Sequence, residues 1–163
     1  MNPGVVSDGV NAAFHALETA AGVGTSAKVD SGSARKIMPP MPGEKRKVMI
    51  LDDNIISLMI AEELLATHGY EVIKMSAPHG CIAKLDYEMP DVLLVDIAMP
   101  RLAADGLLDT IRAATEHEDL IIVLYSDMEA ERLEKICHAK DINGYFCKSM
   151  DITKLPGFID RFF

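Results

Sequence analysis

Two apolar runs in the middle of the chain constrain its fold more than any other feature. Residues 92–95 read VLLV and residues 120–125 read LIIVLY, and neither run alternates between apolar and polar side chains. A strand with one face in water alternates with a period of two, whereas a strand buried on both faces is apolar throughout. Doubly buried strands occur in parallel sheets with helices on both sides, so these runs predict an α/β fold.

The segments around these runs alternate between strand and helix patterns. Strands are expected at 47–51, 70–74, 91–96, 120–126 and 144–148, and helices at about 55–68, 78–88, 105–115, 129–139 and 153–163. Five strands that alternate with five helices predict a parallel sheet with right-handed crossovers and helices on both faces. In such a sheet, ligands bind at the carboxyl ends of the strands.

The first 46 residues differ in composition from the rest. They are rich in Gly, Ala and Ser and carry a net charge of +1, whereas residues 47–163 carry −10. The acidic balance argues against direct nucleic-acid binding by the folded part. We expect residues 1–46 to form a flexible arm and residues 47–163 to form one domain. Within the arm, one segment also fits a short helix with its apolar residues on one face, namely Val10, Phe14, Leu17 and Ala21.

The cysteines and the N-terminus bear on the compartment. No apolar run is long enough to span a bilayer, and the N-terminus lacks the basic start and apolar core of a signal peptide. Cys81, Cys137 and Cys147 are an odd number without the spacing of a metal site. Reduced thiols in a cytoplasmic protein are the simplest interpretation.

Five polar residues stand where the predicted strands end, namely Asp52, Asp53, Asp96, Ser126 and Lys148. Taken singly, each has an ordinary explanation. An acidic pair favours a helix N-terminus, a serine often caps a helix, and a lysine at a strand end is usually solvated. Taken together they are harder to explain, because three carboxylates at one edge of a sheet repel one another unless a cation lies among them.

The chemistry of this set points to phosphate. Carboxylate oxygens are the ligands that Mg²⁺ prefers. A metal and a lysine beside one carboxylate would prepare that carboxylate to attack a phosphoryl group, and would offset the charge that develops on the phosphoryl oxygens. A serine hydroxyl could donate to one of those oxygens. The set therefore predicts a phosphate-accepting aspartate, Asp96, in a metal site.

The motifs around these residues resemble those of a response-regulator receiver domain, the phospho-acceptor half of bacterial two-component signalling. The acidic pair lies in ILDDN, the acceptor in LLVDIAMP, the hydroxyl in VLYSD, and an aromatic residue and the lysine in GYFCKS. Asp96 and Ser126 are 30 positions apart, and Ser126 and Lys148 are 22 apart, as in that family. The resemblance covers residues 47–163 and implies a flavodoxin-like receiver fold, a five-stranded parallel sheet of order 2-1-3-4-5.

The resemblance also implies a metal set and a phospho-acceptor. Asp96 would take the phosphoryl group. Asp53, Asp96 and the backbone carbonyl of Ala98 would hold Mg²⁺, and Asp52 would support the metal through water.

A further implication concerns the switch. Lys148 would pair with the acceptor and then with the phosphoryl group, and Ser126 would donate to a phosphoryl oxygen. The inward shift of Ser126 would make room for Tyr145 to turn inward. This coupled shift would act on the face made by the fourth helix, the fifth strand and the fifth helix.

Some positions depart from the family pattern. Ser149 stands where a proline usually follows the lysine, and Asp127 stands where a small residue usually follows the hydroxyl. Asp127 would place a negative charge beside an incoming phosphate, so Asp127 and Ser149 are candidate modulators. Ala103 and Ala104 stand where Asp-Gly is common, which would reshape the start of the third helix.

These features favour a stand-alone receiver that acts as a switch. Its expected partners are a histidine kinase or phosphotransfer protein and a downstream output protein, and no enzymatic activity is expected beyond self-catalysed phosphorylation and dephosphorylation. One alternative is a receiver-like interaction module in which phosphorylation is weak or unused. Another is a metal-dependent phosphatase or Toprim-type nuclease, but such enzymes need a second carboxylate in one strand-end motif or a dedicated base, and VDIAMP offers neither.

Overall fold

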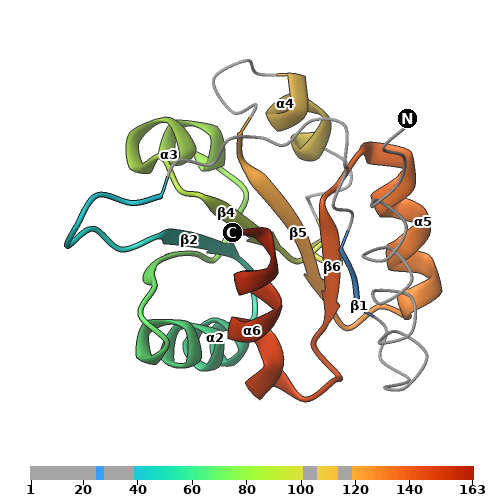
Figure 1. Cartoon of the computed structure of the whole chain (residues 1–163). Helices are drawn as coiled ribbons and strands as arrows, with labels where there is room; N and C mark the ends of the chain where they lie inside the picture. The colour runs from blue at the N-terminus through green and yellow to red at the C-terminus, as the bar shows by residue number, and fades with distance from the viewer. Residues whose placement is uncertain (1–24, 28–38, 101–105, 114–118) are drawn as a thin grey trace, which may run out of the picture.

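The apolar runs form a parallel sheet, as their lack of alternation predicts. The computed structural model describes residues 25–27, 39–100, 106–113 and 119–163. Its parallel strands are β2 (Lys47–Leu51), β3 (Glu71–Met75), β4 (Val92–Val95), β5 (Ile121–Ser126) and β6 (Gly144–Cys147). They lie in the order β3-β2-β4-β5-β6 (Figure 1), which confirms the predicted order 2-1-3-4-5.

A sixth strand lies on the outer edge of β6. β1 (Thr25–Ala27) comes from the N-terminal arm and pairs antiparallel with β6, with Ser26 opposite Tyr145. The sequence pattern does not predict this strand, because three small residues carry no alternation. The helix suggested for residues 10–21 lies outside the part of the chain that the structure describes.

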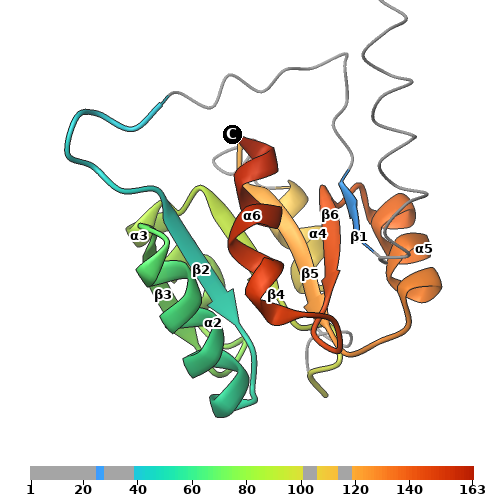
Figure 2. The same ribbon diagram turned by 60° about the horizontal axis from the view of Figure 1, so that its bottom comes forward.

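Helices cover both faces of the sheet (Figure 2). One face carries α2 (Ile55–Thr67) and α6 (Leu155–Ile159), and the other carries α3 (Cys81–Glu88), α4 (Leu107–Ala113) and α5 (Ala130–Lys140). The predicted last helix is divided, since the 3₁₀ turns η2 (Ile152–Lys154) and η3 (Asp160–Phe162) flank α6. Among the described residues, no helix has the length and apolar character needed to cross a membrane.

Each face of the sheet has its own apolar core, because successive strand residues point to opposite faces. Met49, Leu93 and Leu124 pack towards α3, α4 and α5. Ile50 and Leu94, each one position further along its strand, pack towards α2 and α6. Burying one such side chain stabilises the fold by about 1.5–3 kcal/mol. The two cores fix the sheet between the layers and thereby hold the strand ends in place.

The helix ends follow local backbone chemistry. Asn54 caps α2 by accepting hydrogen bonds from the amides of Ile56 and Ser57, so the helix starts directly after the acidic pair. The second predicted helix starts later than residue 78, because Gly80 adopts a left-handed conformation with φ of 79° just before α3. Gly106 has φ of 58° just before α4 in the same way. Ala103 and Ala104 fall outside the described residues.

Candidate functional site

The carboxyl ends of four neighbouring strands bring the predicted site residues together. Asp52 follows β2, Asp96 follows β4, Ser126 ends β5 and Lys148 follows β6. The strand register aligns these ends, since Leu51 pairs with Val95 and Ser126 pairs with Cys147. The site therefore lies at the carboxyl edge of the sheet, where the parallel fold predicts a ligand.

Asp96 is held by three donors. Its Oδ1 atom accepts hydrogen bonds from the Ser126 hydroxyl at 2.7 Å and from the Ala98 amide at 2.8 Å. Its Oδ2 atom accepts a hydrogen bond from Lys148 Nζ at 2.5 Å. The residue is only 6% exposed. A nearly buried carboxylate is costly without such partners, so these contacts explain how a charged residue is tolerated at the end of an apolar strand.

Asp52 and Asp53 complete an acidic cluster with Asp96. One carboxylate oxygen from each of the three residues lies within 4.8 Å of the other two. Asp52 is fully buried, and its Oδ1 atom accepts a hydrogen bond from the Asn54 amide at 2.9 Å. Asp53 is exposed and so opens the cluster to solvent.

One buried oxygen in this cluster bears on metal binding. Asp52 Oδ2 is inaccessible to solvent, and its one partner among the described residues is the ammonium of Lys148, whose Nζ lies 2.7 Å away. A buried carboxylate oxygen with spare acceptor capacity, beside two more carboxylates, fits a hard cation with its water shell. The donor set of this site therefore suits Mg²⁺.

Lys148 provides a positive charge within the acidic cluster. Its side chain is 8% exposed and contacts both Asp52 and Asp96. Burial acts to lower the pKa of Lys148, but the close contacts with the two carboxylates outweigh it, so the pKa lies above its usual value. Lys148 is therefore an ammonium ion at physiological pH and serves as a charge partner rather than a base.

Tyr125 is a site residue that the sequence does not reveal. It lies in the apolar run of β5 and is 1% exposed, so its pattern is that of a core residue. Its ring lies under Lys148, with Nζ 4.9 Å from the ring centroid. Its hydroxyl accepts a long hydrogen bond of 3.4 Å from Ser57 of α2. Tyr125 thus supports the lysine from below and connects it to α2.

Tyr145 lies in the core beside the site. It pairs with Leu124 in the β5–β6 register, two residues before Ser126, and is 5% exposed. It belongs to the core cluster on the side of α3, α4 and α5. The side chain therefore already points into the protein in this structure.

The two unusual residues next to the site are both exposed. None of the described peptide bonds is cis, and this includes the bond between Lys148 and Ser149. Asp127 does not cap α5, because the cap position is Glu129 and no side chain bonds the first amides there. The charge of Asp127 does reach the site, since it adds to the burial that raises the pKa of Tyr125 and of Cys147.

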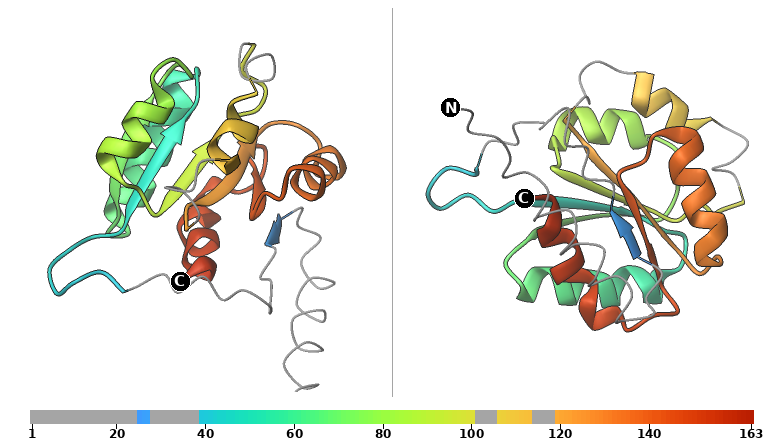
Figure 3. Two further views of the ribbon diagram at one scale, coloured as in Figure 1. Left: turned by 90° about the horizontal axis from the view of Figure 1, so that it is seen from above. Right: turned by 45° about the vertical axis from the view of Figure 1, so that its right-hand side comes forward.

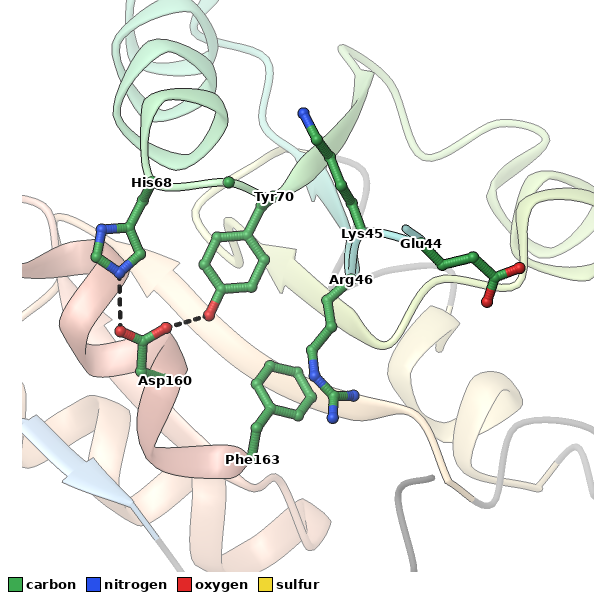
Figure 4. A pocket seen from close by; sticks show the side chains of 8 residues that line it. Glu44, Lys45, Arg46, His68, Tyr70, Asp160 and Phe163 are labelled. Carbon is green, nitrogen blue, oxygen red and sulfur yellow. Dashed lines mark hydrogen bonds and ion pairs between the residues drawn. The ribbon is translucent and has the colours of Figure 1, made fainter. Parts of the chain in front are cut away.

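A hollow of about 320 Å³ lies at the opposite end of the sheet, beside the residues that precede β2 and β3. Figure 4 shows the side chains that line it. There His68 Nε2 lies 2.9 Å from Asp160 Oδ2, and the Tyr70 hydroxyl donates to Asp160 Oδ1. The guanidinium of Arg46 stacks on Phe163, 3.8 Å from the ring centroid. These contacts attach the C-terminal turn to the connection between α2 and β3 and to the residue before β2, so a structural role accounts for this cluster.

Comparisons with known proteins bear on this site. The family model for the response regulator receiver domain matches residues 48–160. Among curated proteins, the chain is 33% identical over 89 residues to "Probable transcriptional regulator ycf27" of Guillardia theta, and 33% identical over 85 residues to "Protein-glutamate methylesterase/protein-glutamine glutaminase 2" of Dechloromonas aromatica. The matches cover 55% and 51% of this chain, but only 35% and 23% of the two relatives.

Solved structures share the fold. The chemotaxis protein CheY4 of Vibrio cholerae superposes with a TM-score of 0.67 at 20% identity, over 74% of this chain and 100% of that one. A response regulator from Thermotoga maritima superposes with a TM-score of 0.64 at 19% identity, over 73% of this chain and 98% of that one. At these identities the likeness concerns the fold alone.

Proposed function

This chain belongs to the response regulator receiver family, and on that premise we propose that it is a phosphorylation switch whose acceptor is Asp96. Receiver domains are signalling switches rather than enzymes in the usual sense. We propose that the reaction here requires Mg²⁺, that any catalysis is limited to self-phosphorylation and dephosphorylation, and that the protein works in the cytoplasm.

The observation that supports this proposal best is the environment of Asp96. It is nearly buried, it is bonded to Ser126 and Lys148, and two further carboxylates approach it. A purely structural carboxylate would need one compensating partner rather than a buried lysine, a buried serine and an acidic cluster. An interaction module without phosphorylation would gain nothing from three carboxylates that repel one another.

The proposed metal ligands are Asp53, Asp96 and the backbone carbonyl of Ala98, with Asp52 acting through water. When bound, Mg²⁺ would offset the negative charge of the carboxylates and of the incoming phosphoryl oxygens.

The chain's own groups support the transfer step as follows. A carboxylate oxygen of Asp96 forms a bond to phosphorus while the bond from phosphorus to the donor's leaving group breaks, and the leaving group departs with the electron pair. The ammonium of Lys148 remains beside the acceptor and stabilises charge on the phosphoryl oxygens. The Ser126 hydroxyl, which now donates to Asp96 from 30 positions away in sequence, can donate instead to an oxygen of the phosphoryl group on Asp96.

The proposed output face is made by α5, β6 and α6. Ser126 and Tyr145 connect the site to this face, because Ser126 pairs with Cys147 of β6 and Tyr145 lies two positions earlier on the same strand. A shift of Ser126 would therefore act on β6 through the sheet. We infer that a downstream protein reads this change.

The phosphoryl donor is proposed to be a histidine kinase or phosphotransfer protein. One relative, 30% identical over 82 residues, is "Hybrid signal transduction histidine kinase C" of Dictyostelium discoideum. In this chain the helix that follows the acidic pair exposes large apolar side chains, namely Ile55, Ile56, Met59 and Ile60. A patch of that kind beside the acceptor is what a protein donor would cover, whereas a small donor would not need it.

Mass spectrometry of the full chain after incubation with acetyl phosphate and Mg²⁺ tests the proposal. The wild type should gain the mass of one phosphoryl group, and Asp96→Asn should gain none while its circular dichroism stays that of a folded protein. Asp109→Asn, an exposed aspartate on α4, is the matched control and should behave as the wild type. Equal phosphorylation of Asp96→Asn and wild type would refute the assignment.

A further inference from the structure

The outer edge of β6 is where a strand of the N-terminal arm joins the sheet. Thr25 pairs with Phe146, Ser26 with Tyr145 and Ala27 with Gly144, in antiparallel register. Figure 3 shows β1 beside β6 at the margin of the sheet. Without β1, the backbone amides and carbonyls on that side of β6 would lack strand partners. An open edge of this kind accepts another strand.

This edge lies within the proposed output face. β6 stands between β5 and β1, with α5 on one side of the sheet and α6 on the other. All four residues of β6 are buried. Their side chains pack in the two cores, so a partner strand could contact β6 only through the backbone groups of its outer edge.

β6 also joins this edge to the acidic site. Cys147, its last residue, pairs with Ser126, and Lys148 follows it directly and binds Asp96. Tyr145, opposite Ser26, is three positions from that lysine. The four residues of β6 therefore connect the edge that pairs with β1 directly to Lys148 and the acidic site.

The strand that fills the edge is well suited to leave it. A ladder of three residue pairs contains few hydrogen bonds, each of small net value in water, and its formation orders a segment of the arm. We propose that the outer edge of β6 is a strand-docking surface, that Thr25–Ala27 occupies it in this chain, and that an output partner displaces these residues to reach it.

This inference rests on the proposed function in one respect only, namely that the molecule that displaces Thr25–Ala27 is an output partner. The pairing itself is tested without metal or phosphoryl donor, so its failure is distinguishable from a failure of Asp96 to accept phosphate.

Hydrogen exchange of the full chain, read by mass spectrometry, tests the occupancy. Neighbouring residues in a strand point their amides to opposite sides, so one of the amides of Ser26 and Ala27 faces β6. Replacing both residues by proline, which has no N–H group, therefore removes that amide in either case. In Ser26→Pro/Ala27→Pro, the β6 amides that face β1 should exchange roughly tenfold faster, because local opening sets that rate. The amides of β4, in the middle of the sheet, should be unchanged.

The matched control is Ser33→Pro/Ala34→Pro, which puts the same residues into the arm beyond β1 and should exchange as the wild type. Unchanged exchange of β6 in the Ser26/Ala27 variant would overturn the occupancy. If β4 also exchanges faster in the double variant, the two prolines have loosened the whole sheet, and Ala27→Pro alone is measured instead. In that variant β6 should still exchange faster than in the wild type while β4 is unchanged.

A peptide tests the docking surface. The probe is a synthetic peptide of residues 23–29, VGTSAKV, added in excess. It should slow the exchange of β6 in the proline variant back towards the wild-type rate, and a scrambled peptide should not. An open edge that neither peptide protects would show that the edge is not a docking surface.

Discussion

The Nζ atom of Lys148 lies 2.5 Å from Oδ2 of Asp96, across 52 positions of sequence. The same Nζ lies 2.7 Å from Oδ2 of Asp52, so one buried ammonium is shared between two buried carboxylates. One positive charge does not neutralise two negative ones, and Asp53 adds a third. The described site thus has an excess of negative charge that a divalent cation would offset, and this imbalance underlies the first two predictions.

Removal of the lysine charge should destabilise the protein strongly. Lys148→Met leaves Asp52 and Asp96 without their shared cation, and breaking a buried ion pair costs about 3–5 kcal/mol, less whatever the carboxylates regain by protonation. Urea unfolding at neutral pH without metal measures the loss. Lys84→Met removes a half-exposed partner of Glu88 on α3 and should cost about 0–1 kcal/mol. A loss for Lys148→Met as small as that of the control would contradict the buried-pair interpretation.

Mg²⁺ should stabilise the fold through the acidic cluster. A ligand that binds only the native state adds RT ln(1 + [L]/Kd), which is about 1.4 kcal/mol at ten times the Kd. A melting curve of the wild type should therefore shift upwards at millimolar Mg²⁺. Asp53→Ala should abolish most of that shift at little cost in the absence of metal, because Asp53 is exposed.

The control for this experiment is Asp119→Ala. Asp119 is also exposed but precedes β5, at the opposite end of the sheet. It should keep the full Mg²⁺ shift. An equal shift in Asp53→Ala and Asp119→Ala would remove Asp53 from the ligand set.

The contact between Tyr70 and Asp160 should make stability depend on pH. Partial burial acts to raise the pKa of Asp160, but hydrogen bonds from Tyr70 and His68 outweigh it, so the pKa lies below its usual value. A carboxylate whose pKa is lower in the folded state stabilises the protein above its unfolded pKa of about 3.9, and this contribution is lost as the pH falls through the folded pKa. Tyr70→Phe should cost about 1 kcal/mol at neutral pH.

The cost of Tyr70→Phe should shrink as the pH is lowered from 5 to below ~3, because protonation of Asp160 weakens the bond in the wild type as well. Urea unfolding across that range measures it. Tyr87→Phe is the matched control, since Tyr87 is 85% exposed, and it should have little effect at any pH. A cost for Tyr70→Phe that does not vary with pH would show that Asp160 is not its partner in solution.

Much of the fold follows from sequence because strands buried on both faces lack alternation. The site follows as well, because parallel strands bring their carboxyl ends to one edge, and Asp96, Ser126 and Lys148 stand at those ends. Tyr125 could not be predicted, since a tyrosine within an apolar run has the same pattern whether it supports a lysine or only fills a core. Its role depends on Ser57 and Lys148, which are distant in sequence.

The pairing of β1 with β6 could not be predicted for a different reason. Strand pairing at an edge uses backbone groups, which every residue has, so Thr25–Ala27 carries no side-chain signature of its partner. Helix starts were displaced for local reasons, as at Gly80, whose left-handed conformation delays α3. The pattern of side chains along the sequence therefore does not predict contacts between distant residues or contacts made by the backbone alone.

The last prediction concerns Asp127, the exposed residue that follows Ser126. A carboxylate there repels a doubly negative phosphoryl donor, and near a protein surface a like-charge contact of this kind costs on the order of 1 kcal/mol. That cost corresponds to roughly a fivefold lower rate. Asp127→Ala should therefore speed phosphorylation by acetyl phosphate about fivefold, and high salt should reduce the difference because the charge is exposed to solvent.

A role in helix capping would predict the opposite pattern. Because the cap position of α5 is Glu129 and no side chain bonds the amides there, we expect Asp127→Ala to leave the melting temperature nearly unchanged. Glu129→Ala is the control, as it removes an exposed carboxylate two residues further from Ser126, and it should change the rate less than Asp127→Ala does. The acetyl phosphate rate and the melting temperature are measured on the same samples. A lower melting temperature with an unchanged rate in Asp127→Ala would make this residue a structural cap and would remove the electrostatic reason for slow phosphorylation by small donors.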